Sequence, residues 1–289
     1  MKIKKAALVR LGMNPNTWLK RYGKLFIHKV MKAARVIYHR GVVDNFLGVC
    51  GLGVGDLKIE CFKSDENTAS VYLFGLSDNP THFDLYSKYV QPSSIAVDVG
   101  ANVGIHSLVM SRCVGATGAV YSYEPSKTIF ERLSRNVLVN DTGNIVVNNV
   151  AVGHHSGEIG FADHSNGSNI GISHIDEASS LKVPLVTLDD HLEGVGRIGF
   201  IKIDVEGYEL DVIKGAQKIL EEFRPVLVME FNAERYDLTE LLAALPYDAE
   251  IYIIPETYYD KLEKLAEVDI RQSGYCSQCN LLVLPVLRT

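Results

Sequence analysis

Cysteine is scarce in this sequence, and long apolar runs are missing. The five cysteines among 289 residues are an odd number spread thinly along the chain, which argues against a disulfide-rich secreted domain and favours the reducing cytoplasm. No run of about 18 apolar residues occurs, so a membrane-spanning helix is not expected. With 47% hydrophobic and 22% charged residues, the composition is that of a globular protein large enough to bury a full core.

Acidic residues are missing from residues 1–40, which hold eleven of the 29 lysines and arginines. The rest of the chain therefore carries 18 basic side chains against 35 acidic ones. Apolar residues recur within residues 1–45 at near-helical spacing, so we predict a basic helical N-terminal extension there. Two interpretations stay open: a solvated extension, or an arm that contacts an anionic surface such as a membrane or an acidic glycolipid.

From Ile95 onward, short apolar runs alternate with segments of helical spacing. Strands are predicted at residues 95–99, 120–123, 145–150, 200–204, 226–231, 251–254 and 281–286. Helices are predicted at residues 103–113, 126–139, 208–222 and 234–244. This alternation is typical of a doubly wound α/β domain, with a mostly parallel seven-stranded sheet covered on both faces. The main domain is expected over residues 91–289, with its ligand crevice at the carboxyl ends of the strands.

A smaller unit is predicted ahead of the main domain, at residues 46–90. Glycines punctuate its first part, and short alternating runs follow at Leu57–Glu60 and Val71–Phe74. Alternation of this kind predicts strands. We therefore expect a small β-rich lead-in, with some helix, packed on the main domain.

The strongest chemical signal follows the first strand of the main domain. That strand ends in Asp98–Gly100, and the chain then turns through Ala101–Gly104 toward a helix. Gly100 lets the backbone approach a ligand, and Gly104 lets the helix pack tightly. The G-x-x-x-G spacing differs from the G-x-G-x-x-G of dinucleotide sites. An acid directly before the first glycine would repel a pyrophosphate, so the loop favours a cofactor with a cationic amino group and no phosphates.

Glu124 follows the second strand of the main domain, 20 residues after Gly104. A carboxylate at that strand tip can accept hydrogen bonds from both ribose hydroxyls of a nucleoside. The alternative is a solvated acid that begins a turn at Pro125. Because Glu124 follows the glycine loop at this spacing, the ribose role is favoured.

A second acidic run, Ile201–Glu209, ends the fourth strand of the main domain. Asp204 and Glu206 stand where doubly wound enzymes keep their reactive groups. Such a pair can act as a general base for an acceptor hydroxyl, or as ligands for a divalent cation. Lys202 is expected to pair with a carboxylate. No dedicated metal site is predicted.

Five blocks of the sequence carry a family resemblance. In chain order they are Asp98–Ser107, Asn149–Gly153, Val186–Asp190, Lys202–Glu209 and Val226–Glu230. Together they resemble the FkbM family of S-adenosylmethionine-dependent methyltransferases, over roughly residues 80–235. The resemblance implies a class I methyltransferase fold and, commonly, O-methylation in polyketide, sugar or glycolipid pathways. Residues 1–60 and the tail beyond residue 232 match nothing that we can name.

The resemblance also implies roles for the matching residues. The methionine end of S-adenosyl-L-methionine would be held by Asp98, Gly100, Ala101, Asn102 and Gly104. Glu124 would take the ribose, and the turn near Ala151 would lie against the adenine. The residues facing the acceptor would be Asp204, Glu206 and Glu230, and which of them is the base stays open. His106 and His191 are further candidates for the base, and a divalent cation is not indicated.

We therefore expect an S-adenosylmethionine-dependent methyltransferase that acts on a hydroxyl of a sugar, glycolipid or other small molecule. Two alternatives remain. The basic arm suits a methyltransferase of nucleic acid, because phosphate contacts dominate such binding. However, the body is acidic, and Asp204–Gly207 lacks the Asn/Asp-Pro-Pro-aromatic run that amino-methylating enzymes carry. The arm also suits a non-catalytic membrane-surface protein with a relic fold, but the intact acids at both strand ends argue against decay.

Overall fold

The computed structural model describes residues 46–52, 54–62, 65, 68–69, 71–72, 80–165, 172–232, 235–254, 262–265 and 278–286. The predicted basic extension, residues 1–45, lies outside these ranges. So do Leu73 and Phe74 of one predicted strand. No helix in the described ranges combines the length and the apolar character that crossing a bilayer requires.

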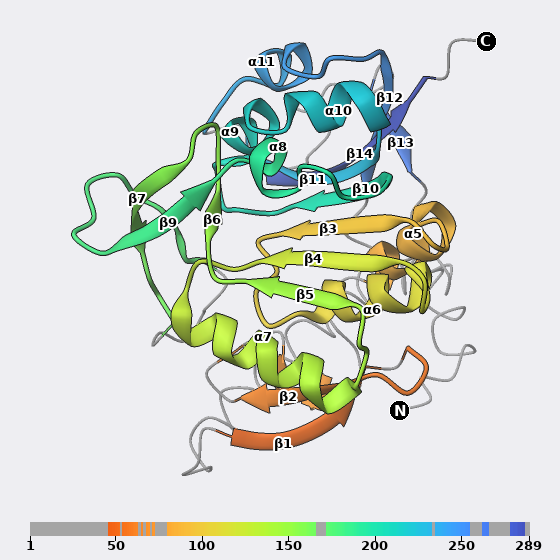
Figure 1. Ribbon diagram of the computed structural model, residues 1–289, viewed down its shortest axis with the longest axis vertical. Coiled ribbons are helices and arrows are strands. Elements are labelled where there is room, and N and C mark those ends of the chain that lie inside the picture. Colours follow the sequence, from red (N-terminus) through yellow and green to blue (C-terminus); the bar gives the residue numbers. More distant parts are fainter. Residues whose placement is uncertain are drawn as a thin grey trace, which may run out of the picture. The chain divides into compact units, whose positions relative to one another are not determined.

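A central sheet of eight strands frames the described part of the chain (Figure 1). In spatial order its strands are β13 (Glu263–Lys264), β12 (Ala249–Ile254), β14 (Gln278–Pro285), β11 (Val226–Asn232), β10 (Ile198–Ile203), β3 (Ile95–Val99), β4 (Ala119–Tyr123) and β5 (Ile145–Asn148). The five strands from β11 to β5 pair in parallel, whereas β14 is antiparallel to both neighbours. All seven predicted strands are in this sheet, and the two-residue β13 is an eighth strand that was not predicted. The chain order reverses between β3 and β10, the place where doubly wound folds bind ligands.

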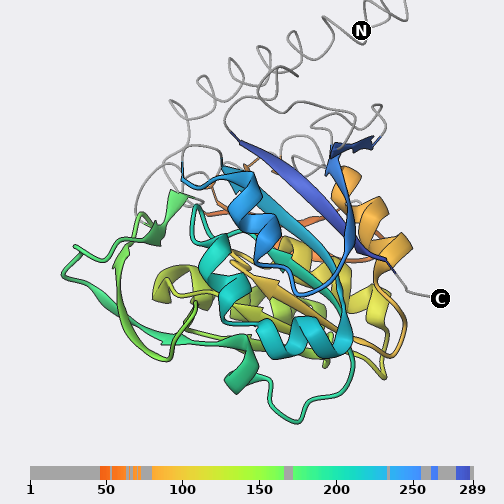
Figure 2. The ribbon, with the colours of Figure 1, turned by 90° about the horizontal axis from the view of Figure 1, so that it is seen from above.

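Helices cover both faces of the central sheet (Figures 1 and 2). One face carries α8 (Leu188–His191), α9 (Glu209–Lys214), α10 (Gln217–Phe223) and α11 (Leu238–Ala243). The other carries α5 (Pro80–Tyr89), α6 (Ile105–Val114) and α7 (Lys127–Asn140). Because successive strand residues point to opposite faces, Val97 and Val99 pack in the first layer and Ala96 packs in the second. The doubly wound α/β class predicted from the sequence is confirmed.

The predicted helix at residues 208–222 is two helices, α9 and α10. The chain breaks between them because the carbonyl of Gly215 accepts a hydrogen bond from the Asp189 amide at 3.0 Å instead of continuing the helix. The carboxylate of Asp189 then accepts from the amides of Lys218 and Ile219, both at 3.0 Å, and so caps the first turn of α10. A capping acid supplied from a distant segment cannot be recognised in a local pattern.

The lead-in begins with an antiparallel hairpin of β1 (Phe46–Gly51) and β2 (Lys58–Phe62). Figure 1 shows it beside α7, where the amide oxygens of Asn140 and Asn136 accept from the backbone of Lys58 and Glu60. The strand predicted at residues 57–60 is therefore confirmed, with a shift of its ends.

The second strand predicted in the lead-in covers residues 71–74, of which the structure describes 71 and 72. The prediction is wrong for these two residues. Val71 and Tyr72 are helical, as are Thr68 and Ala69. The carboxylate of Asp65 accepts from the Thr68 amide at 3.3 Å, which favours the start of a helix. Four alternating residues are too few to distinguish the two-residue period of a strand from the 3.6-residue period of a helix.

A second sheet of four strands follows β5, drawn in green in Figures 1 and 2. Its spatial order is β6 (Ala151–Val152), β9 (Lys182–Val186), β7 (Gly157–Ala162) and β8 (His174–Ile175). Ile159, Phe161, Val183 and Leu185 form its core. The sequence analysis did not predict this sheet, because two of its strands have only two residues and Pro184 interrupts a third.

Candidate active site

A pocket opens at the carboxyl ends of β3, β4 and β10, where the strand order reverses. Its wall comes from the loop after β3, the tip of β4, the first strands of the small sheet, β8, and the end of β10. The lining residues are 99–103, 105–106, 123–125, 129, 150–152, 161, 173–175, 202 and 204–206. The predicted ligand crevice is therefore present at the expected edge of the sheet.

The loop after β3 is tightly built. Gly100, Asn102 and Gly104 all adopt left-handed backbone conformations, with φ of +78°, +50° and +92°. A Cβ on Gly100 would lie 1.8 Å from the carbonyl oxygen of Asp204. A Cβ on Gly104 would lie 2.5 Å from a side-chain methyl of Leu133 on α7. Glycine is therefore required at position 100 because the Asp204 backbone lies against it, and at position 104 because α7 packs against it.

Gly100→Ala should disrupt this loop far more than the same change should disrupt the turn at Gly115, which shares only the positive φ. Gly115 has a φ of +70° and nothing within 4 Å of an added Cβ. Gly115→Ala is expected to cost only the backbone strain of a residue with positive φ, about 1–3 kcal/mol in the free energy of unfolding. Gly100→Ala must also displace the Asp204 backbone, so it should lower stability further and abolish cofactor binding. Denaturant unfolding and calorimetric titration with S-adenosylhomocysteine would measure both effects, and equal losses in the two variants would contradict the close packing.

Glu124 lies at the tip of β4 and is buried, with 5% of its surface exposed. One carboxylate oxygen accepts from the Asn102 amide at 3.0 Å and the other from the Ser126 amide at 2.9 Å. Burial raises the pKa of Glu124 to about 7, although these two hydrogen bonds lower it. Each oxygen keeps a further lone pair for a ligand hydroxyl. Glu124 thus joins the glycine loop to the pocket wall.

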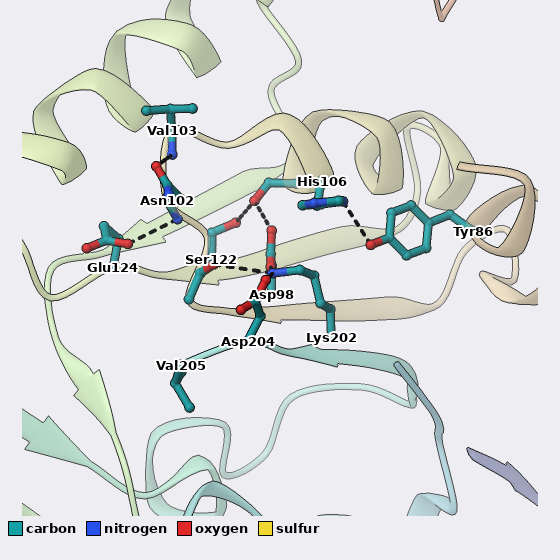
Figure 3. A network of polar contacts seen from close by, with 12 residues as sticks. Tyr86, Asp98, Asn102, Val103, His106, Ser122, Glu124, Lys202, Asp204 and Val205 are labelled. Atoms are coloured by element: carbon teal, nitrogen blue, oxygen red, sulfur yellow. Dashed lines mark hydrogen bonds and ion pairs between the residues drawn. The ribbon is translucent and has the colours of Figure 1, made fainter. Parts of the chain in front are cut away.

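Asp98 lies behind the pocket wall, in contrast to the position that a ligand-binding carboxylate would take. It is completely buried and is not among the lining residues. Its carboxylate accepts from the Ser107 hydroxyl at 2.6 Å and lies 3.3 Å from the Lys202 ammonium (Figure 3). Asp98 and Lys202 are direct neighbours in the β3–β10 register. The predicted pairing of Lys202 with a carboxylate is confirmed.

Lys202 joins three groups at the pocket floor. Its ammonium lies 3.3 Å from carboxylate oxygens of both Asp98 and Asp204 (Figure 3). It also lies 3.3 Å from the Gly100 carbonyl oxygen. These contacts match the three protons that a lysine can donate. Burial lowers the pKa of Lys202, but the two carboxylates raise it above the ordinary lysine value. Lys202 therefore stays charged and holds the ends of β3 and β10 together.

Three carboxylates that the sequence analysis assigned to the acceptor side lie close together, and Asp204 and Glu206, but not Glu230, line the pocket. Asp204, Glu206 and Glu230 bring one oxygen each within 4.8 Å of one another, and all three are partly buried. Such a set has the donor chemistry for a divalent cation. Burial raises the pKa of Glu206 to about 7, and the charges of Asp204 and Glu209 add to the rise. Glu206 also has a φ of +57°, a strained conformation for a residue with a side chain.

Glu209 closes the loop that carries these acids. It is completely buried, and one carboxylate oxygen accepts from the amides of Val205 and Gly207 at 3.2 and 3.0 Å. The other accepts from the hydroxyl of Tyr236 at 2.6 Å. Glu209 is the first residue of α9. The sequence analysis did not predict that Glu209 binds the loop amides or that Tyr236 donates to Glu209, because no local motif indicates these contacts.

The two histidine candidates lie in different places. His106 is the second residue of α6 and lines the pocket, and its Nδ1 lies 2.9 Å from the Tyr86 hydroxyl (Figure 3). His191 makes the same kind of contact, 2.9 Å from Nδ1 to the Tyr123 hydroxyl. However, His191 is exposed and is not among the lining residues. Only His106 is placed to meet a ligand.

An apolar wall faces the glycine loop across the pocket. Val150, Ala151 and Val152 line it, together with Phe161 and His174 from the small sheet. Ala151 was predicted here. Phe161 and His174 were missed, since the strands that carry them were not recognised. Aliphatic and aromatic side chains of this kind suit a purine ring.

The charges that line the pocket decide which cofactor it fits. Its acids are Glu124, Asp204 and Glu206, and its one lysine or arginine within the described residues is Lys202, whose protons are already engaged. A pyrophosphate would meet repulsion with no free cation to bind it. A nucleoside with a cationic sulfonium and amino group, such as S-adenosylmethionine, matches the ribose acid, the apolar wall and the negative charge.

The strand order, the switch point and this pocket define a class I S-adenosylmethionine-dependent methyltransferase. A sequence model described as "Methyltransferase FkbM domain" matches residues 98–253, more than half of the chain. The chain therefore belongs to the FkbM methyltransferase family, as its motif blocks predicted.

Two methyltransferases are similar in sequence to part of the chain. The hexuronic acid methyltransferase AglP of Haloferax volcanii is 29% identical over 171 residues, which cover 58% of this chain and 69% of AglP. The methyltransferase sdnD of Sordaria araneosa is 27% identical over 156 residues, covering 42% of this chain and 60% of sdnD. The chain thus spans less than two thirds of sdnD.

Solved structures give weaker matches. A crystal structure of methyltransferase FkbM from Methylobacillus flagellatus is 20% identical, with a TM-score of 0.43, and the match covers 75% of this chain and 54% of that one. An S-adenosylmethionine-dependent O-methyltransferase from Thermotoga maritima is 12% identical with a TM-score of 0.42, covering 76% and 71%. Both scores are below 0.5, so the fold assignment rests on the strand topology and the family match.

Proposed function

We propose that the chain methylates a hydroxyl of a carbohydrate acceptor, with Glu206 as the general base. Glu206 carries the proposal. It lines the pocket in a strained conformation beside Asp204, and burial brings the pKa of its carboxyl to about 7. A base with a pKa near the working pH is the most effective one, and the strain marks a position kept for chemistry.

The cofactor is proposed to lie between the glycine loop and the apolar wall. Glu124 accepts hydrogen bonds from the ribose hydroxyls, and Gly100, Ala101, Asn102 and Gly104 shape the backbone around the methionine end. Ala151 lies against the adenine. Asp98 acts from behind the wall, because its carboxylate is occupied by Ser107 and Lys202. It sets the position of Lys202 instead of contacting the cofactor.

When bound, S-adenosylmethionine supplies an electrophilic methyl group on a sulfonium. The protein then has two tasks, which are to place the acceptor oxygen in line with that methyl group and to remove its proton. Glu206 accepts the proton. Asp204, held by Lys202 at 3.3 Å, orients the acceptor without moving, and Glu230 completes the acidic side of the site.

A carbohydrate fits this acidic side well. Carboxylates accept hydrogen bonds and cannot donate them when ionised, so the cluster of Asp204, Glu206 and Glu230 selects a molecule rich in hydroxyl donors. The relative AglP acts on a hexuronic acid, which supports the same class of acceptor here. A hydroxyl, unlike a carboxylate oxygen, requires a base.

The proposed function is tested by methyl transfer to two probes, methyl β-D-glucuronoside and methyl β-D-glucoside. Labelled S-adenosylmethionine should give a labelled sugar that survives mild alkali, because a methyl ether is stable where a methyl ester is hydrolysed. Label released by alkali would reassign the reaction to a carboxyl group. Transfer to neither probe would contradict a monosaccharide acceptor of this class.

Glu124→Gln should weaken binding of S-adenosylhomocysteine by about 10- to 150-fold, since hydrogen bonds to a charged acceptor contribute about 1.5–3 kcal/mol. The glutamine amide would also face a backbone amide that now donates to the carboxylate. Isothermal titration would measure the dissociation constant. Glu131→Gln, an exposed change on α7, is the matched control. Unchanged affinity in Glu124→Gln would remove Glu124 from the cofactor site.

A further inference from the structure

Two histidines and a tyrosine meet at the pocket edge where α5 packs on α6. The rings of His82 and Tyr86 lie 5.6 and 5.7 Å from the ring of His106, both in edge-on arrangements. Tyr86 is completely buried, and His82 is 7% exposed. His106 alone reaches the pocket lining. The proposed methyl transfer as described above uses none of the three.

The hydrogen bond between Tyr86 and His106 has a definite direction. Burial, together with the negative charges of Asp98 and Asp204, raises the pKa of Tyr86 well above its ordinary value, so the phenol keeps its proton. Its hydroxyl has no partner among the described residues besides His106 Nδ1, at 2.9 Å. A buried hydroxyl that donated to nothing would lose a hydrogen bond. The phenol therefore donates to Nδ1, and the ring proton of a neutral His106 is on Nε2.

The charge of His106 follows from its neighbours. Burial, the ammonium of Lys202 and the ring of His82 lower the pKa of His106 well below its ordinary value. Burial and Lys202 likewise lower the pKa of His82 to about 4. Proton uptake by His106 would place an imidazolium near a buried lysine, in a site that also receives a cationic cofactor. Both histidines are thus neutral at physiological pH.

We infer that His106 is a neutral hydrogen-bond donor that positions an acceptor oxygen, with its tautomer fixed by Tyr86, and that it is not the general base. A base needs a free lone pair, whereas Nδ1 of His106 already accepts from the Tyr86 hydroxyl and Nε2 carries the ring proton. The inference rests on the proposed function for the identity of the ligand. Tyr86 is a positioning residue, because it acts through His106.

The tautomer can be measured without any substrate. In the full chain with ¹⁵N-labelled histidine, long-range ¹H–¹⁵N spectra should show His106 with a protonated Nε2 and an unprotonated Nδ1 at neutral pH and down to pH 6. Tyr86→Phe removes the donor and should lose this preference. A protonated Nδ1 in the wild type, or an imidazolium at pH 7, would overturn the inference. This readout is independent of catalysis.

Kinetics with methyl β-D-glucuronoside separate a donor from a base. His106→Gln keeps an N–H donor and should retain turnover within about threefold, whereas His106→Leu should raise the acceptor KM by roughly 3- to 10-fold. The pH profile should not change in either variant. His191→Gln is the matched control, because His191 has the same contact with a tyrosine but is exposed. A base would instead lose about 100-fold or more in His106→Gln, together with the acidic limb of the profile.

The ligand that receives the hydrogen bond is decided by binding measurements. Affinity of His106→Leu for S-adenosylhomocysteine should equal that of the wild type, while its affinity for the glucuronoside, titrated into the complex, should fall. An equal loss for S-adenosylhomocysteine would assign the donor to the cofactor carboxylate and overturn the acceptor role. If the wild type does not bind the probe, the proposed acceptor class fails, and the tautomer measurement alone decides the inference.

Discussion

Glu206→Gln is expected to lower the turnover number by about 100- to 10,000-fold, the usual contribution of a general base. The change preserves the size of the side chain and removes only its ability to take a proton. Affinity for S-adenosylhomocysteine should remain within about twofold, because Glu206 is proposed to face the acceptor. Steady-state kinetics with methyl β-D-glucuronoside and calorimetry on the same preparation would separate the two effects.

The pH profile gives an independent measure of the same residue. A carboxyl base works only when it is ionised, and the pKa of Glu206 is raised to about 7. Wild-type activity should therefore rise with pH through about 7 and level off above it. This limb should disappear from the residual activity of Glu206→Gln.

Two controls protect this interpretation. Glu222→Gln changes an exposed acid on α10 and should leave kcat and its pH profile unaltered. The chelator EDTA should have no effect on the wild type. Loss of activity with EDTA and recovery with Mg²⁺ would instead assign Asp204, Glu206 and Glu230 to a cation. Full activity of Glu206→Gln would remove the base role.

Lys202→Met should lower the free energy of unfolding by about 3–5 kcal/mol, because removing one partner of a buried ion pair leaves an uncompensated charge. The carboxylate left without its ion-pair partner is that of Asp98, which has no exposed surface. Asp204 also loses its ion pair, but its side chain is 38% exposed and can be hydrated. Most of the loss is therefore attributed to Asp98.

The double variant Asp98→Asn with Lys202→Met tests this attribution. It removes the buried charge and should recover part of the stability lost in Lys202→Met, as measured by urea unfolding. Lys214→Met breaks a half-exposed contact of 3.8 Å with Glu240 and should change stability little. A double variant no more stable than Lys202→Met would show that the cost lies elsewhere.

The central sheet could be predicted from the sequence because each apolar strand is recognisable from its own residues. β3 was placed at its observed ends, 95–99, and all seven predicted strands entered one sheet. The small sheet was not predicted, because its strands are short and its core residues come from separated segments. The break between α9 and α10 at Gly215 was not predicted either, since its cause is Asp189, which is distant in the sequence.

The candidate site was predicted in its residue types and only partly in its geometry. The sequence placed Asp204, Glu206 and Glu230 on one side, and their oxygens do meet. It also assigned Asp98 to contact the cofactor, whereas the strand register pairs Asp98 with Lys202. Register between strands more than a hundred residues apart depends on the whole sheet, so the burial of Asp98 could not be read from its motif.

Tyr86 comes from α5, upstream of residues 98–253 that define the family. The hydroxyl that orients His106 is thus contributed by a helix that precedes the residues matched by the family model. Exchanging residues 46–90 between relatives would replace that partner while leaving the strand-end carboxylates in place. In the proposed mechanism, such an exchange would alter how the acceptor is positioned and would leave the proposed base, Glu206, unchanged.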